Sequence, residues 1–250
     1  MENSIEARDA ALYEGPATAR LENFGAVSPD DKRSLAELAG PPTEFKRGDI
    51  IRSDRDASTC LHLLLDGWAA SAITMEDGSR QLTSVSLPGD ILGMPTLAVS
   101  YPLDTIVALD SVRACVIPAK PFMELLMDRP RLAAVLFLIS QEERMFAMER
   151  LALMGRAPAR DRLAALFVRL RERCSQLSNV SADRFPMPLR QSDIGDLIGT
   201  STVHTNRILK NFRELNLAVI KKRELEILDN DRLLARAGVS AWHRAEPSWL

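Results

Sequence analysis

Cysteine is scarce in this chain and widely scattered. Only three of the 250 residues are cysteine, and Cys60, Cys115 and Cys174 stand far apart. An odd, unclustered set argues against a disulfide framework and is typical of a reducing cytoplasm. No Cys-x-x-Cys pair occurs, so zinc and iron–sulfur sites lack their usual ligands.

Long apolar runs are also lacking, and no signal peptide is expected. The longest apolar run, 132–139, is far too short to span a bilayer. Residues 1–20 have mixed charge and lack the apolar region of a signal peptide. The three histidines of the chain form no cluster with carboxylates, which a metal-dependent enzyme needs. We therefore expect a soluble, cytoplasmic protein that holds no metal, is not an enzyme and does not contact membranes.

The net charge is only −2, but it is unevenly distributed. Residues 156–228 hold 14 Lys and Arg against 8 Asp and Glu, a net charge of +6. Residues 1–154 hold 15 against 23, a net charge of −8. A basic C-terminal module beside an acidic N-terminal one suits a nucleic acid held by one half of the chain.

A helix-turn-helix pattern lies within the basic module. Ile194, Leu197 and Ile198 fall at i, i+3 and i+4, which predicts one apolar stripe on a first helix. Gly199 then suits a left-handed helix end, and Ser201 suits the cap of a second helix. This layout places one helix in the major groove of DNA.

The second helix has two distinct faces. Its inner stripe consists of Thr205, Ile208, Leu209 and Phe212. The positions that would meet base edges are Thr202, Val203, Asn206 and Arg207. The positions that would meet phosphates are Ser201, His204, Lys210 and Arg213, with Lys221, Lys222 and Arg223 further along.

Residues 218–228 predict a small hairpin whose tip is the basic run Lys221-Lys222-Arg223. A recognition helix followed by such a wing is a winged helix-turn-helix. The alternative is a surface helical hairpin of a larger core, because short motifs carry false positives.

The N-terminal half has a different sequence pattern, which is typical of β-strands. From 44 to 117, short apolar strands alternate with turn signals, and glycines recur at 67, 78 and 89. This spacing predicts a small β-barrel or roll. The flanking segments are expected to be a loosely ordered stretch at 1–20 and helices within 21–40, at 118–128, at 161–174 and at 230–237.

A long helix is expected from Pro130 to Leu153. Its residues at alternating steps of three and four form a heptad seam, which predicts pairing with a second copy. The seam consists of Leu132, Val135, Ile139, Glu142, Phe146, Glu149 and Leu153. The alternative is a core helix, since three heptads are weak evidence.

These patterns predict an α+β chain with a jelly-roll-like β-roll, a dimerisation helix and a winged helix-turn-helix, and the resemblance given below implies that the roll is a sensor. The expected boundaries are a sensor domain at 1–129, the dimerisation helix at 130–154, a hinge at 155–158, the DNA-binding domain at 159–238 and a flexible tail at 239–250.

The order of features resembles the cyclic-AMP receptor protein and fumarate–nitrate regulator family of bacterial transcription factors, over about residues 40–230. The carriers are Gly67, Gly78, Gly89-Asp90, Gly93, the long helix after Pro130, and the run from Asp193 to Lys210 with Asn206-Arg207. The resemblance implies a cytoplasmic homodimer that binds a palindromic operator and contacts RNA polymerase.

The sensor departs from that family. Met94 stands where cyclic-AMP-binding members carry the glutamate for the ribose hydroxyl, and Asp104 stands where they carry the phosphate-binding arginine. We therefore expect no cyclic AMP binding. Residues 1–45 lack the cysteine cluster of the fumarate–nitrate type. No cofactor is expected; His62 is a candidate haem ligand, the alternative being a hydrogen-bonded strand histidine.

The reading helix departs as well. Val203 and His204 replace the family's usual Glu and Thr, while Arg207 is kept and can clamp guanine. Arg190 stands where a capping Thr is common, so the first helix is expected to begin at Ser192 or to lack a side-chain cap. The leading hypothesis is a sequence-specific transcription regulator. The alternatives are a ligand-binding regulatory domain without DNA and a metal-dependent enzyme.

Overall fold

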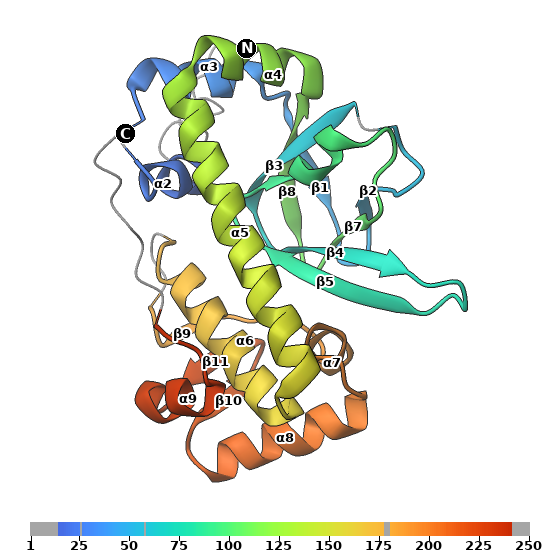
Figure 1. The fold of residues 1–250 in the computed structure, drawn as a ribbon, viewed down its shortest axis with the longest axis vertical. Coiled ribbons are helices and arrows are strands. Elements are labelled where there is room, and N and C mark those ends of the chain that lie inside the picture. The colour runs from blue at the N-terminus through green and yellow to red at the C-terminus, as the bar shows by residue number, and fades with distance from the viewer. Residues whose placement is uncertain (1–14, 26, 58, 178–180, 242–250) are drawn as a thin grey trace.

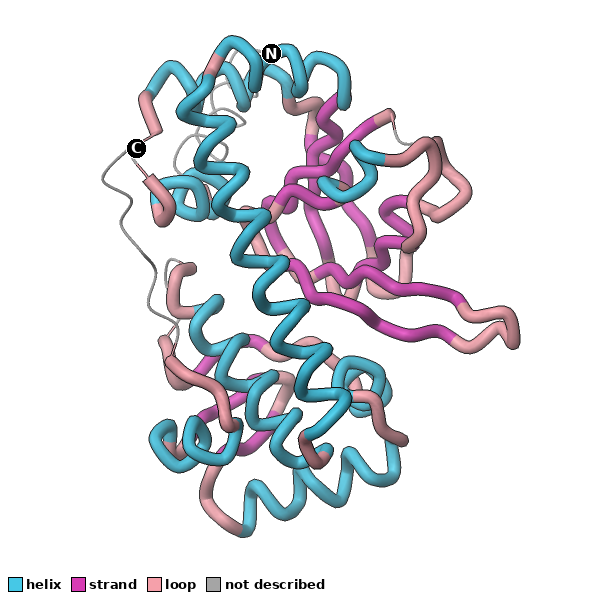
Figure 2. The backbone as a smooth tube through the Cα atoms, in the orientation of Figure 1, coloured by secondary structure: helices cyan, strands magenta, loops and turns pink. Residues whose placement is uncertain are grey.

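The computed structural model describes residues 15–25, 27–57, 59–177 and 181–241. Figure 1 shows one long helix, α5 (Pro130–Arg156), running down the molecule between two lobes. A sheet-rich lobe lies beside its upper half, and a mostly helical lobe surrounds its lower end. Figure 2 shows that most of the strands gather in the upper lobe.

The upper lobe is a β-roll of two four-stranded antiparallel sheets, ordered β1-β8-β3-β6 and β2-β7-β4-β5. Its strands are β1 (Pro42–Phe45), β2 (Ile50–Arg52), β3 (Cys60–Asp66), β4 (Ala69–Thr74), β5 (Arg80–Ser86), β6 (Ile91–Leu92), β7 (Thr105–Ala108) and β8 (Val112–Pro118). A 3-10 helix, η1 (Met94–Ala98), follows β6. This is the predicted roll.

Turn glycines space the strands as the sequence predicts. Gly67, Gly78 and Gly89 all have positive φ, a conformation that glycine adopts without a steric penalty. At Gly67 a Cβ atom would lie 2.1 Å from the carbonyl oxygen of Ser111, so no other residue fits there without displacing the backbone.

Two helices precede the roll, α2 (Pro16–Glu22) and α3 (Pro29–Leu38). The expectation that the chain is loosely ordered up to residue 20 is therefore wrong from Pro16 onward, while residues 1–14 lie outside the described part. Helix α3 begins with a capping box in which Ser28 and Asp31 satisfy each other's backbone N–H groups. Both helices pack their apolar side chains against the roll and the upper half of α5.

Helix α4 (Ala119–Asp128) leads into α5, which ends two residues beyond the predicted boundary at residue 154. Gly155 and Arg156 continue the helix, so only Ala157 and Pro158 separate α5 from the next one. The extended ψ of Ala157, 144°, ends the helix because a residue before proline disfavours helical geometry. The segment between the two helices is thus confined to the last two residues of the predicted 155–158 hinge, and its role as a hinge stays a prediction.

The lower lobe has the winged helix-turn-helix order. Its elements are α6 (Ala159–Cys174), β9 (Arg184–Pro186), α7 (Gln191–Ile198), α8 (Thr202–Glu214), β10 (Ala218–Lys221), β11 (Glu224–Ile227) and α9 (Asn230–Ala237). Strand β9 pairs with β11 of the hairpin. Phe167 of α6 meets Phe212 of α8 edge to face, with ring centroids 6.1 Å apart, at the centre of this core. Of the predicted tail, residues 242–250 lie outside the described part.

Candidate nucleic-acid interface

Helices α7 and α8 are held at a fixed angle by a close backbone contact. Gly199 ends α7 with φ +63°, as predicted. A Cβ atom at Gly195 would lie 2.8 Å from the carbonyl oxygen of Thr200, so glycine allows α7 to approach the turn. Ser201 caps α8, because its hydroxyl accepts a hydrogen bond from the His204 backbone N–H at 3.3 Å.

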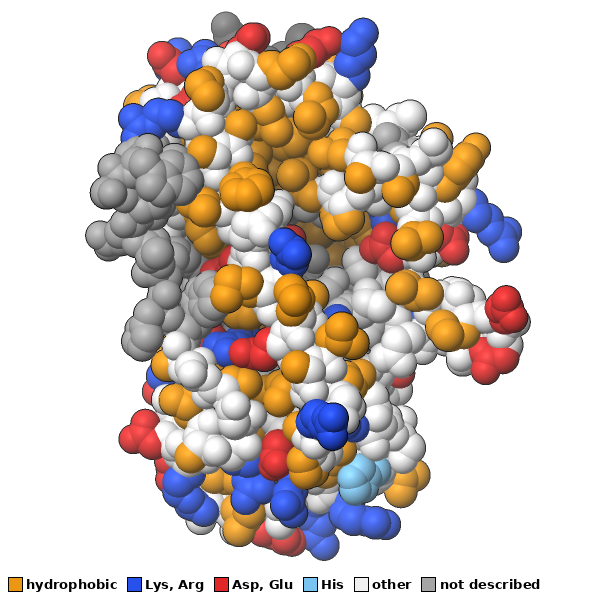
Figure 3. Space-filling model, in the orientation of Figure 1, with side chains coloured by type: hydrophobic (Ala, Val, Ile, Leu, Met, Phe, Trp, Pro, Cys, Tyr) orange, Lys and Arg blue, Asp and Glu red, His pale blue; other side chains and the backbone are white. Residues whose placement is uncertain are grey.

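The two faces of α8 separate as predicted. Thr205, Ile208 and Phe212 are buried in the lobe core, and Leu209 is half-buried. The remaining predicted positions on this helix are all exposed: Ser201, Thr202, Val203, His204, Asn206, Arg207, Lys210 and Arg213. Figure 3 shows Lys and Arg side chains gathered at this end of the molecule.

Two exposed side chains of α8 stand out. Val203 is 70% exposed although it is apolar, so the fold of the protomer does not use it. Arg207 forms no ion pair or hydrogen bond with any described residue, whereas Lys210 lies 3.8 Å from Glu214 on the same helix. The guanidinium of Arg207 is therefore available to an external acceptor.

The wing hairpin turns at two residues with positive φ, Lys222 at 51° and Arg223 at 64°. Consecutive positive φ values are those of a type I′ turn, which suits the twist of a hairpin. Lys221, Lys222 and Arg223 are exposed at the tip, as predicted. In this arrangement the tip lies near the roll. Burial first, and then the charges of Arg190 and Arg223, lower the pKa of Arg47.

The first helix of the motif is fastened to the roll through Asp193, which is 3% exposed. Its carboxylate pairs with Arg47 at 2.9 Å and with Arg80 at 3.0 Å. It also accepts the backbone N–H of Arg190 at 2.8 Å, at the N-terminus of α7. Helix α7 thus begins after Arg190, one residue before the predicted Ser192, and an acidic side chain of its own first turn replaces the missing cap.

A second ionic cluster joins both lobes above the linker. Asp90, in the loop before β6, accepts Arg173 of α6 at 2.7 Å and lies 3.5 Å from Arg20 of α2. Arg20 also pairs with Glu142 of α5 at 2.6 Å. Burial favours a raised pKa for Asp90, but the charges of Arg173 and Arg20 outweigh it and hold the pKa below its usual value.

The side chains of the predicted heptad seam of α5 make contacts within their own protomer. Leu132 and Val135 pack in the upper core with Ile139, and Glu142 is buried against Arg20. In the lower half Phe146 lies under the guanidinium of Arg169, Glu149 pairs with that same arginine, and Leu153 packs on the lower core. Leu132, Val135 and Glu142 are buried within the protomer, whereas Ile139, Phe146, Glu149 and Leu153 are only partly buried. Pairing of this seam with a second copy stays a prediction. A heptad repeat shows that a helix has an apolar face, but not which partner covers it.

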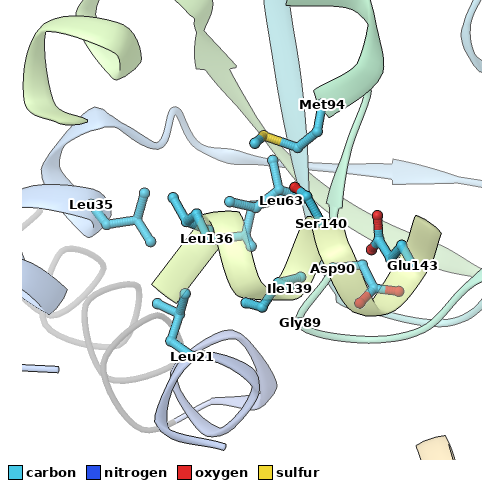
Figure 4. Close-up of a pocket in the computed structure, with 11 residues that line it drawn as sticks. Leu21, Leu35, Leu63, Gly89, Asp90, Met94, Leu136, Ile139, Ser140 and Glu143 are labelled. Atoms are coloured by element: carbon cyan, nitrogen blue, oxygen red, sulfur yellow. The ribbon is translucent and has the colours of Figure 1, made fainter. Parts of the chain in front are cut away.

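The positions that bind cyclic AMP in the resembling family have other partners here. Asp104 pairs with Arg52, whose side chain is 3% exposed and donates to the Asp104 carbonyl oxygen at 2.9 Å. The carboxylate is thus neutralised rather than free. Met94, in η1, lines a small pocket under α5, where Asp90 and Glu143 lie close together at one end (Figure 4).

His62 is 6% exposed in β3, where burial and then Arg52 lower its pKa. Its Nδ1 atom has no hydrogen-bond partner among the described residues. In the same part of the chain no group of three or more His, Cys, Asp and Glu side chains is placed to hold a metal ion. No helix within the described ranges is both long and apolar enough to cross a membrane.

A winged helix-turn-helix joined by a long helix to a β-roll defines a DNA-binding regulator with a sensory domain. Residues 161–236 match the Crp-like helix-turn-helix domain, and residues 42–129 match the cyclic nucleotide-binding domain. The chain belongs to the family of the cyclic-AMP receptor protein and the fumarate–nitrate regulator. It is a DNA-binding transcription regulator and not an enzyme.

Individual relatives agree with this assignment. The nitrogen fixation regulation protein FixK of Bradyrhizobium diazoefficiens is 28% identical, over 80% of this chain and 84% of its own length. The fumarate and nitrate reduction regulatory protein of Vibrio cholerae is 28% identical, over 78% of this chain and 75% of its own. The solved structure of FixK2 from Bradyrhizobium japonicum superposes with a TM-score of 0.72 at 18% identity, covering 82% of this chain and all of that one, which shows a shared fold.

Proposed function

We propose that this protein reads a specific DNA sequence through the exposed face of α8. The observation that carries the proposal is the unpaired guanidinium of Arg207 beside the exposed apolar Val203, on a helix whose other face is buried. Arg207 is suited to donate two hydrogen bonds to a guanine edge, and Val203 to contact a thymine methyl group. Thr202 and Asn206 complete the base-reading set.

The phosphate-binding set surrounds that face. Lys210 and Arg213 continue along α8, while Ser201 and His204 lie at its N-terminus, where helix backbone N–H groups favour an anion. Lys221, Lys222 and Arg223 form the wing contact. Because the wing tip lies near the roll, its contact with DNA requires the duplex to pass that side or the lobe to turn at Ala157–Pro158.

The active form is a homodimer joined through an exposed stripe of α5, which we define as Phe137, Arg144, Met148 and Leu151. Phe137 is 59% exposed and Leu151 is 74% exposed. Residues 137, 144 and 151 follow a seven-residue repeat, with 148 in the intervening position, so the stripe forms a second seam on the outward side of the helix. Figure 3 shows apolar side chains along this face. A second copy of α5 carries the same seven-residue repeat, so its exposed stripe can pack against this one.

Two copies would present two α8 helices about one DNA turn apart, roughly 34 Å, and so read a palindromic operator in the cytoplasm. RNA polymerase is the expected further partner. The signal that the roll receives is not cyclic AMP, since neither Met94 nor the neutralised Asp104 offers the partner that the nucleotide needs.

A DNA selection from a random duplex pool with the full chain tests this function. We expect an enriched motif with two inverted half-sites whose centres are about 10 base pairs apart. Binding to the selected site should weaken steeply as salt rises, because phosphate contacts release counterions. A pool that shows no enrichment, with equal affinity for every duplex, would overturn the proposal.

A further inference from the structure

A large cavity lies between the roll, α5 and α6, and the DNA-reading role leaves it unused. Its volume is about 590 Å³, within the range of small-molecule sites. Along α5 it extends from Ser140 to Met154, a helix length of about 21 Å. Strands β5 and β6 form its upper wall, and α6 forms its lower wall.

The two ends of the cavity differ in charge. At the upper end, beside η1, the lining includes three carboxylates, those of Asp90, Asp104 and Glu143. Glu143 lies beside Asp90 at this end (Figure 4). The lower end is bounded by apolar side chains, of which Leu153, Leu166 and Leu170 are examples, and by arginines of α5 and α6. Asp90 pairs with Arg173 and Asp104 pairs with Arg52, so the charge that a ligand meets depends on the lining side chains that have no such partner.

Most of the lining arginines already have partners. Arg162 donates to the carbonyl oxygens of Ile198 at 2.7 Å and Ala157 at 3.0 Å. Arg169 pairs with Glu149 and Glu172, and Arg173 pairs with Asp90. These three guanidinium groups therefore already have acceptors within the protomer.

Arg150 differs from these three. It lines the cavity from α5, is half-buried, and makes no ion pair or hydrogen bond with its side chain to any described residue. Burial lowers its pKa, with no carboxylate near enough to offset the effect. A partly desolvated guanidinium without a counter-charge is energetically costly, and a bound anion would remove that cost.

We propose that the lower end of this cavity binds an amphipathic monocarboxylate, with the carboxylate on Arg150 and the apolar part against Leu153 and Leu166. A guanidinium matches a carboxylate through two parallel hydrogen bonds, which fixes the head of the ligand. A neutral molecule leaves Arg150 unpaired, and one carboxylate is enough to pair with it. The positions of Met94 and Asp104 place the family's nucleotide contacts at the upper end, so the proposed site is a separate one.

The site also lies across the linker. Leu153 belongs to α5, and Leu166 belongs to α6 of the DNA-binding lobe, so a bound apolar chain would contact both sides of Ala157–Pro158. Ligand binding there would favour one orientation of the lobe.

Two fluorescent probes with the same aromatic skeleton test the site on the full chain without DNA. 8-Anilinonaphthalene-1-sulfonate carries one negative charge, and N-phenyl-1-naphthylamine carries none. We expect the anionic probe to bind at least tenfold more tightly to the protein than to Arg150→Gln. The uncharged probe should bind both within twofold. Decanoate should displace the anionic probe from the unaltered chain.

Arg156→Gln is the matched control, because Arg156 is exposed on the same helix and does not line the cavity. It should behave as the unaltered protein does. Equal affinity of the anionic probe for the unaltered chain and Arg150→Gln would overturn the proposal, as would a failure of decanoate to compete. Circular dichroism on each variant verifies the fold. Arg150→Lys keeps the positive charge but loses the planar, two-donor geometry of the guanidinium, so it should bind the anionic probe with intermediate affinity. Since no DNA is present, the result is independent of the DNA-reading function.

Discussion

Arg80 and Asp193 form an ion pair, 3.0 Å between nitrogen and oxygen, that joins strand β5 of the roll to the first helix of the DNA-binding motif. Arg47 reaches the other oxygen of the same carboxylate from the loop after β1. The orientation of the reading helix in this structure therefore depends on the roll, because α8 packs closely on α7 at Gly195.

Removing this carboxylate should destabilise the docked lobe. Asp193→Ala leaves Arg47 partly buried without its counter-charge and removes the acceptor at the N-terminus of α7. We expect a loss of about 2–3 kcal/mol in the free energy of unfolding, with Arg80 contributing little because its side chain is 43% exposed to solvent. Urea unfolding followed by circular dichroism measures this.

Asp196→Ala is the matched control, since Asp196 lies 3.6 Å from Arg80 and is partly exposed. Its loss should cost less than about 1 kcal/mol. If the two variants unfold at the same urea concentration, the pairs at Asp193 do not hold the lobes together.

Sequence specificity should depend on Arg207. We expect Arg207→Ala to cost about 1–3 kcal/mol at the selected operator and to relax the preference at one guanine, because the bidentate contact is lost. Lys221→Ala should weaken all sequences alike and flatten the salt dependence. Arg33 is an exposed arginine of α3, and Arg33→Ala should change neither the sequence preference nor the salt dependence of binding. Gel shifts over a salt series measure all three, and an unchanged motif for Arg207→Ala would mean that another face reads the DNA.

Assembly should depend on the outward stripe of α5. Phe137→Glu with Leu151→Glu places two charges where the second copy is proposed to pack. We expect a folded monomer in sedimentation equilibrium, with much weaker operator binding because a single α8 reads only a half-site. Met127→Glu, also exposed but on α4, should remain dimeric. A double variant that still sediments as a dimer would place the interface elsewhere.

The inward seam should respond differently. Ile139 and Phe146 contact the protomer's own roll and α6, so Ile139→Glu with Phe146→Glu is expected to lower the free energy of unfolding before it changes the state of assembly. A far-ultraviolet melt separates the two effects.

Local signals in the sequence were sufficient for the fold, but contacts between distant segments were not. The helix-turn-helix follows from a 3.6-residue period, one glycine and one cap, all within 191–213, and the roll follows from its turn glycines. The partner of each face of α5 depends on residues far along the chain. Asp90 and Arg173 are 83 positions apart. Arg47 and Asp193 are 146 positions apart. No local pattern predicts either pair, so the ionic clusters between the lobes were missed.

Cyclic AMP should not bind at micromolar concentrations. Met94 offers no acceptor to a ribose hydroxyl, and the charge of Arg52 is satisfied by Asp104 rather than left for a phosphate. Calorimetric titration with cyclic AMP and cyclic GMP should give no heat, and neither should change operator affinity. Micromolar heat would mean that Arg52 exchanges Asp104 for phosphate, and Arg52→Met would then abolish it.

Only one of the three thiols should react readily in the native protein. Burial raises the pKa of Cys174 to about 12, although the charge of Arg173 opposes this, so the reactive thiolate is nearly absent at pH 8. Cys115 is fully buried in β8, whereas Cys60 is half-exposed at the start of β3. Titration with a disulfide reagent should show one fast thiol in buffer and three in denaturant. The Cys60→Ser variant should lose the fast phase and keep two thiols in denaturant. A second fast thiol in the native chain would show that α6 opens from the core on the time scale of the reaction.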